Sequence, residues 1–269
     1  MATELVHREH RGPVCTLTLD SPHNRNALSA LLLDELAAHL TAVTGDATVR
    51  AVILTAVGPA FCSGADLSAP PTMITSRVPA ILDTIRTARV PVIARVAGHA
   101  RAGGLGLIAT CDLAAATAPS TFGFSEVRVG VAPAMILVPA LRVADRRFLA
   151  RAALTGEPFG APAAAAAGLL TEVVEDEPAL DAWVAEVVAS LLKSAPGAVG
   201  ATKELLAELA EMDWAEGLTR ANARSAELFA GAEAVEGMDA FLHKRPPSWD
   251  EAVPTGAVPD KAVPEKAVP

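Results

Sequence analysis

The chain has 269 residues, 51% of them hydrophobic and 20% charged, which is enough apolar material for one large buried core. Its formal net charge of −9, from 22 basic and 31 acidic residues, argues against a nucleic-acid-binding surface, because such a surface normally shows a basic patch. The three cysteines have neither disulfide nor metal-site spacing, so we expect reduced thiols and no metal ion.

Targeting and membrane segments are not evident in the sequence. The first ten residues are rich in charge and lack the apolar stretch of a secretory signal, and later apolar stretches are interrupted by Gly, Pro or charge before they reach membrane-spanning length. We therefore expect a cytoplasmic protein that binds neither a membrane nor nucleic acid.

The first half of the chain alternates strand and helix patterns. Val14–Leu19 alternates as a strand does, and Ser29 is a predicted N-cap for a helix that Gly45 ends. The apolar residues of this helix recur on one face: Leu32, Leu36, Leu40 and Val43. Short apolar runs, typical of strands buried on both faces, follow at Ala51–Ala56, Val90–Val96 and Leu113–Ala116. This alternation predicts an α/β fold.

The second half is mainly helical in pattern. Helices are predicted at Met135–Ala144, Arg146–Leu154, Leu180–Leu192, Ala198–Leu209 and Trp214–Phe229, with one short strand at Val173–Val174. Near the end, Ala-Val-Pro recurs with a period of five residues, and regularly spaced prolines exclude a helix. We divide the chain into an α/β core (1–195), a helical region (196–249) and a disordered tail (250–269).

Two glycine-bearing loops, 61–67 and 98–106, directly follow predicted buried strands. Such loops direct free amide N–H groups at the carboxyl edge of a sheet, so each is a candidate donor to a developing negative charge, as in an oxyanion hole. For either loop alone, close packing of helix on strand is the favoured interpretation. Residues 104–109 also match the dinucleotide fingerprint G-x-G-x-x-A, but this pattern often matches by chance and lies late in the chain, which disfavours it.

Few side chains qualify for chemistry. Cys62 and Ser63 have no histidine nearby in sequence, so packing is favoured over a nucleophilic role. His99 lies inside the second loop, where ligand contact and an ordinary loop position are equally supported. Glu126 follows the apolar segment 122–125, which would desolvate it and raise its pKa towards the range of a general acid/base. A helix cap or salt bridge explains Glu126 equally well.

Taken in order, these segments resemble the crotonase superfamily (enoyl-CoA hydratase/isomerase) over most of residues 3–249. The matching motifs are 20–22 with 26–29, 61–67, 96–104 with 111–113, 122–130 and 236–246. The resemblance implies a spiral of ββα turns with a C-terminal helical trimerisation region. It also implies an acyl-CoA thioester substrate, no cofactor beyond the coenzyme A of the substrate, and a homotrimer or homohexamer.

The resemblance also implies roles for individual residues. Glu126 corresponds to the acid/base glutamate, and the N–H groups of Ala65 and Gly103 correspond to the oxyanion-hole donors. Contacts to substrate or coenzyme A are implied for Ala27, Leu28, Ser63, Gly64, Asp66, Leu67, His99, Gly104 and Lys244, the last towards the phosphates.

One departure from the family pattern affects the predicted reaction. Typical hydratases carry two glutamates, and the first position falls here on Gly106, twenty residues before Glu126. His99, a water molecule, or Arg101 acting on a substrate carboxylate are candidate replacements. Three hypotheses follow: a 2-enoyl-CoA hydratase, a one-glutamate isomerase or decarboxylase, and a weakly active acyl-CoA-binding protein. The sequence leaves acyl chain length, branching and stereochemistry open.

Overall fold

The computed structural model describes residues 4–68, 71–250 and 252, without the side chains of 71–75. Its strands are β1 (Val6–Arg11), β2 (Val14–Leu19), β3 (Ala51–Ala56), β4 (Ala60–Cys62), β5 (Val92–Val96), β6 (His99–Arg101), β7 (Leu113–Thr117), β8 (Thr121–Gly123), β9 (Phe159–Gly160) and β10 (Glu172–Val174). Its α-helices are α1 (Ala30–Thr44), α2 (Pro71–Thr87), α3 (Gly103–Thr110), α4 (Ala134–Val143), α5 (Arg146–Thr155), α6 (Ala161–Ala166), α7 (Glu177–Leu192), α8 (Pro196–Leu209), α9 (Trp214–Phe229) and α10 (Ala232–Leu242). Two 3-10 turns are η1 (Pro22–Asn24) and η2 (Glu126–Val129).

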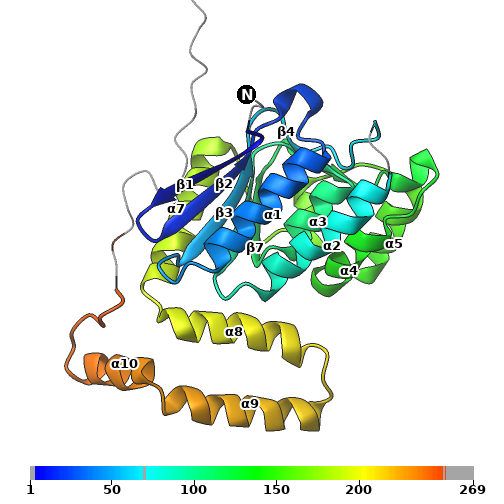
Figure 1. The fold of residues 1–269 in the computed structure, drawn as a ribbon. Coiled ribbons are helices and arrows are strands. Elements are labelled where there is room, and N and C mark those ends of the chain that lie inside the picture. Colours follow the sequence, from blue (N-terminus) through cyan, green and yellow to red (C-terminus); the bar gives the residue numbers. More distant parts are fainter. Residues whose placement is uncertain (1–3, 69–70, 251, 253–269) are drawn as a thin grey trace, which may run out of the picture.

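A six-stranded sheet forms the centre, in the order β1-β2-β3-β5-β7-β10 (Figure 1). The hairpin β1–β2 is antiparallel, and the remaining neighbours pair in parallel. The predicted strands are confirmed, with β5 starting two residues late because Pro91 precedes it. We did not predict β1, since its charged residues conceal the strand pattern; it pairs in register from Val6 opposite Leu19 to Arg11 opposite Val14.

The central sheet is buried on both faces, as the apolar runs predict. In β3, Val52 and Leu54 join the core cluster that includes the apolar face of α1. Ala51 and Ile53 point the other way, into a second cluster with residues of α7. The Ser29 hydroxyl caps α1 by accepting a hydrogen bond from the Leu32 N–H at 3.3 Å, as predicted.

A second, smaller sheet positions the loops that follow its strands. Its order is β4-β6-β8-β9, with β4, β6 and β8 parallel and β9 antiparallel at the edge. Each of β3, β5 and β7 is followed by one strand of the small sheet and then by helical structure. This is the ββα spiral that the resemblance implies. Because β4, β6 and β8 are parallel neighbours, their carboxyl ends, and the loops that leave them, lie along one edge.

The C-terminal helices α8, α9 and α10 form a layer below the core (Figure 1). Lys203 of α8 fixes this layer: its buried ammonium group donates to the Asp112 carboxylate at 2.7 Å and to the Ile85 carbonyl at 2.8 Å. A charge-assisted bond inside the protein is stronger than one at the surface. The α8 helix is therefore attached to both α2 and the end of α3.

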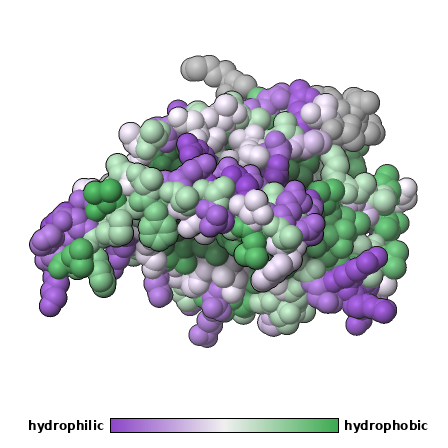
Figure 2. Space-filling view, turned by 90° about the horizontal axis from the view of Figure 1, so that it is seen from below, coloured by the Kyte–Doolittle hydropathy of each residue, from purple (hydrophilic) through white to green (hydrophobic). Residues whose placement is uncertain are grey.

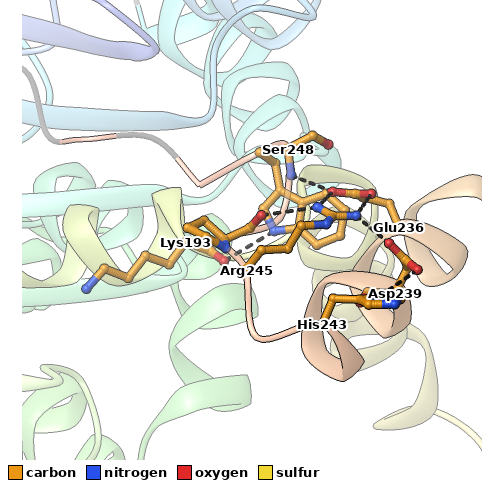
Figure 3. A network of polar contacts seen from close by, with 8 residues as sticks. Lys193, Glu236, Asp239, His243, Arg245 and Ser248 are labelled. Atoms are coloured by element: carbon orange, nitrogen blue, oxygen red, sulfur yellow. Dashed lines mark hydrogen bonds and ion pairs between the residues drawn. The ribbon is translucent and has the colours of Figure 1, made fainter.

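A cluster of polar contacts holds the chain after α10 (Figure 3). Arg245 bridges the carboxylates of Glu236 and Asp239, each at 2.7 Å, and Glu236 also accepts from the Ser248 N–H at 2.8 Å. Hydrogen bonding from Arg245 lowers the pKa of Glu236 to about 2. The segment after α10 is thus folded back onto its own helix.

Two sequence predictions concern the remaining chain. The tail predicted for 250–269 lies outside the described residues, apart from 250 and 252. In the described part, no single helix has the length and apolarity to span a membrane; α7 and α8 meet those criteria only together, with a bend of 109° between them.

Candidate active site

The loop after β4 is held in place by the segment before α1. The Leu28 N–H donates to the Gly64 carbonyl at 2.8 Å, and the Asp66 N–H donates to the Leu28 carbonyl at 3.4 Å. In a parallel bridge of this kind, the residue between the two bonded groups directs its own N–H away from the partner. The amide of Ala65 therefore points away from Leu28.

Asn26 is a buried side chain that ties the segment before α1 to the connection between β3 and β4. Its Oδ1 accepts from the Ser21 N–H at 2.7 Å, and its Nδ2 donates to the carbonyls of Ala60 at 2.7 Å and Val57 at 3.0 Å. Its φ of 55° is left-handed, a conformation that asparagine tolerates better than most residues. The resemblance to the crotonase superfamily includes Asn26 in the motif 26–29, but it does not predict these hydrogen bonds.

The loop after β6 carries local backbone strain. Ala102 has φ 48° and ψ −120°, a region that favours glycine, and strain of this kind costs about 1–3 kcal/mol for other residues. Gly103 follows as the first residue of α3, where the N–H has no intrahelical acceptor. Within residues 4–68 and 71–250, neither the Ala65 N–H nor the Gly103 N–H donates to a protein acceptor.

The two loops lie against each other. A Cβ added to Gly64, whose φ is +93°, would lie 2.7 Å from the Ala102 Cβ and 3.6 Å from the Gly103 nitrogen. A Cβ added to Gly103 would lie 2.5 Å from Leu28 Cδ1. Larger residues at either glycine would push the loops apart. Two unpaired amide donors on touching loops are the arrangement that an oxyanion hole requires.

Glu126 follows β8, the next strand of the small sheet, and begins η2. Its side chain is half-buried, and Oε2 is buried with no hydrogen-bond partner in the described part of the chain. Burial raises the pKa of this carboxyl, and its own backbone N–H offsets the shift only in part. A cap or salt bridge would give Oε2 a partner, so the geometry favours a carboxyl kept for proton transfer.

Thr121 of β8 holds both polar side chains of β6. His99 is exposed, and its Nδ1 accepts from the Thr121 N–H at 3.2 Å, so the neutral ring carries its proton on Nε2. The Arg101 guanidinium donates to the Thr121 carbonyl at 2.6 Å, to its hydroxyl at 2.8 Å and to the Ala100 carbonyl at 2.9 Å. Arg101 is thus engaged in holding the small sheet, and its burial lowers its pKa.

The remaining residues of the first loop mainly support its shape. Burial raises the pKa of the Cys62 thiol to about 12, and a Cβ at Gly104 would lie 2.8 Å from Cys62 Cβ, so this cysteine packs rather than reacts. The Ser63 hydroxyl donates to the Asn24 carbonyl at 3.2 Å. Asp66 accepts from both the N–H and the hydroxyl of Ser68, and the hydroxyl bond lowers its pKa.

The structure brings together most of the predicted site residues, but not all. Nine of them lie on the loop after β4, at the start of α3, or on the segment before α1 that holds the loop: Ala27, Leu28, Ser63, Gly64, Ala65, Asp66, Leu67, Gly103 and Gly104. Ala27 and Leu28 are buried, whereas Leu67 is 76% exposed. Lys244 lies two residues beyond the end of α10, a helix on the far side of α8 from the core and from β4 (Figure 1). Within one chain, Lys244 is therefore remote from the loops.

Known proteins resemble this chain over nearly its whole length. The profile of the enoyl-CoA hydratase/isomerase family matches residues 9–252. A putative enoyl-CoA hydratase of Thermus thermophilus is 31% identical over 88% of this chain and 97% of its own. A mevalonyl-coenzyme A hydratase of Aspergillus fumigatus is 32% identical over 88% of this chain and 91% of its own.

Solved structures agree with the sequence comparisons. The crystal structure of an enoyl-CoA hydratase of Mycobacterium smegmatis superimposes with a TM-score of 0.87 at 34% identity, covering 92% of this chain and 99% of the other. By profile, sequence and fold, the chain belongs to the enoyl-CoA hydratase/isomerase family.

Proposed function

We propose that the protein is a hydratase that adds water to, or removes water from, a 2-enoyl-CoA thioester. The observation that carries this proposal is the edge of the small sheet, where the unpaired N–H groups of Ala65 and Gly103 and the unpartnered carboxyl oxygen of Glu126 follow three adjacent strands. The thioester oxygen accepts from both amides. Each donor of this kind lowers the barrier by about 3 kcal/mol.

Hydration in such a site routes one proton through Glu126, from the water to C2. The ionised carboxyl takes a proton from water as the water oxygen bonds to C3, and the electrons of the C2–C3 double bond move onto the thioester oxygen as an enolate. The enolate then collapses, and C2 takes the proton back from Glu126. Burial raises the pKa of this carboxyl towards neutral pH, so it serves better both as the base that takes the proton and as the acid that returns it.

Isomerisation is the second candidate, and Gly106 favours it. With no carboxyl at position 106, one base can still remove a proton from C4 and return it to C2, and this reaction needs no positioned water. Decarboxylation of a carboxylated acyl-CoA uses the same enolate. A protein that only binds acyl-CoA would use the donors without turnover.

The test is a panel of enoyl-CoA and carboxylated enoyl-CoA thioesters, with products identified by mass spectrometry. Hydration adds the mass of one water, isomerisation leaves the mass unchanged, and decarboxylation removes carbon dioxide. A product one water heavier supports the hydratase. Binding without conversion of any thioester in the panel would support the acyl-CoA-binding protein instead.

We also propose a homotrimer, or a dimer of trimers, as the working assembly. Large apolar side chains of α9 and α10 are exposed in the single chain, among them Trp214 and Phe241 at 82% each and Phe229 at 68%. Figure 2 shows hydrophobic patches on the face seen from below, where α8, α9 and α10 lie. Exposed apolar surface of this kind marks an interface. In such an assembly, Lys244 would meet the coenzyme A of a neighbouring subunit, and a monomer in sedimentation at micromolar concentration would contradict the proposal.

A further inference from the structure

Position 106 lies one helical turn after the proposed oxyanion donor Gly103. Gly106 lies three residues after Gly103 on α3, so the two positions share one face of the helix. Side chains on a helix lean towards its N-terminus and cover the preceding turn. A side chain at position 106 would therefore lie over the turn that begins with Gly103, whose amide is a proposed oxyanion donor.

Ile136 of α4 fills this space. A Cβ added to Gly106 would lie 2.6 Å from Ile136 Cγ2, 3.1 Å from its Cβ and 3.6 Å from its Cα. Ile136 is buried, with 4% of its surface exposed, and its branched Cβ holds Cγ2 in one rotamer, so the methyl group does not swing aside cheaply. The glycine and the isoleucine thus form one contact that docks α4 on α3.

We propose that Ile136 is a specificity-determining residue that occupies the place of a second acid/base group and closes the site on the side of α3. Proton transfer then depends on Glu126 alone. This inference rests on the proposed function for its meaning in catalysis, but the Gly106–Ile136 contact itself is a property of the fold. The two parts are therefore tested by separate measurements.

The first measurement is a thermal-stability cycle on Gly106→Ala, Ile136→Gly and the double variant. We expect Gly106→Ala to lower the melting temperature in the native background and to lower it clearly less in the Ile136→Gly background, where the clash is gone. The matched control is Gly217→Ala in α9, where the added Cβ meets its nearest neighbours at 3.8 and 3.9 Å. The claim that Ile136 excludes a side chain at position 106 would be refuted if Gly106→Ala lowered the melting temperature equally in the two backgrounds. It would also be refuted if Gly106→Ala lowered the melting temperature no more than Gly217→Ala does. The outcome does not depend on activity.

The second measurement is hydration of crotonyl-CoA by Gly106→Glu and by Gly106→Glu/Ile136→Gly. We expect the double variant to exceed both the wild type and the single variant by about tenfold or more, within the range that an added general acid/base supplies. A single variant as fast as the double, or a folded double variant with no gain, would overturn the assignment of Ile136. Failure of the wild type to convert any enoyl-CoA would instead refute the proposed function and leave the stability cycle intact.

Discussion

Replacing Gly64 by alanine perturbs the point where the loops after β4 and β6 touch. The residue has φ +93°, so an alanine is strained by about 1–3 kcal/mol before any contact is considered. The new Cβ would also lie 2.7 Å from Ala102 Cβ, and such overpacking costs about 1–3 kcal/mol more. Because Ala102 directly precedes Gly103, relief of this clash moves the amide that we propose as an oxyanion donor.

The control for the strain of an alanine at positive φ is Gly130→Ala. Gly130 has φ +81° and no atom within 4 Å of an added Cβ, so this variant carries the conformational strain alone. By urea denaturation, we expect the free energy of unfolding of Gly64→Ala to be about 1–3 kcal/mol below that of Gly130→Ala. Turnover of Gly64→Ala should fall by roughly 100-fold, since a donor displaced by about 1 Å loses most of its effect. A Gly64→Ala protein as stable as Gly130→Ala, with native turnover, would refute the claim that this contact between the loops positions the amide of Gly103.

Three further predictions concern stability. Burial raises the pKa of Glu126, so between the ordinary value of 4.5 and the raised value the folded protein binds more protons than the unfolded chain. The contribution of this group to stability therefore declines as pH rises through that window, and Glu126→Gln should melt at a higher temperature than the wild type at neutral pH. A difference in melting temperature that persists below pH 4.5 would contradict this prediction. Lys203→Met leaves the Asp112 carboxylate without its buried partner and should cost on the order of 3 kcal/mol in urea denaturation, with partial recovery in Lys203→Met/Asp112→Asn. Truncation after Glu251 should leave turnover and melting temperature unchanged, because the Ala-Val-Pro repeat offers no periodic apolar face; a loss of either shows that the tail docks on the protein.

Much of the fold was predictable because long elements carry strong local signals. The apolar face and Ser29 cap of α1 locate that helix, and the apolar run of β3 marks a strand buried on both faces. The strands β4, β6 and β8 have three residues each, too few for a periodic pattern, so the small sheet was not predicted from periodicity. Its existence followed only from the resemblance to the crotonase superfamily.

In the candidate site, too, only features with a local sequence signal were predictable. Glu126 was identifiable because the apolar segment before it predicts desolvation, and burial does raise its pKa. The roles of His99 and Arg101 were open in the sequence because their partner, Thr121, lies on the neighbouring strand. Ile136 was missed for a similar reason, since its contact with Gly106 joins two helices thirty residues apart and no local pattern records it.

The most direct test of the account is the turnover of Glu126→Gln on the thioester that the wild type converts. Glutamine keeps the shape of the side chain but cannot transfer the proton, so we expect turnover to fall by roughly 100-fold or more while the dissociation constant for the thioester changes little. That result would leave the oxyanion hole intact and assign the proton transfer to Glu126. Near-native turnover in Glu126→Gln would contradict the account, and His99 would become the next residue to test.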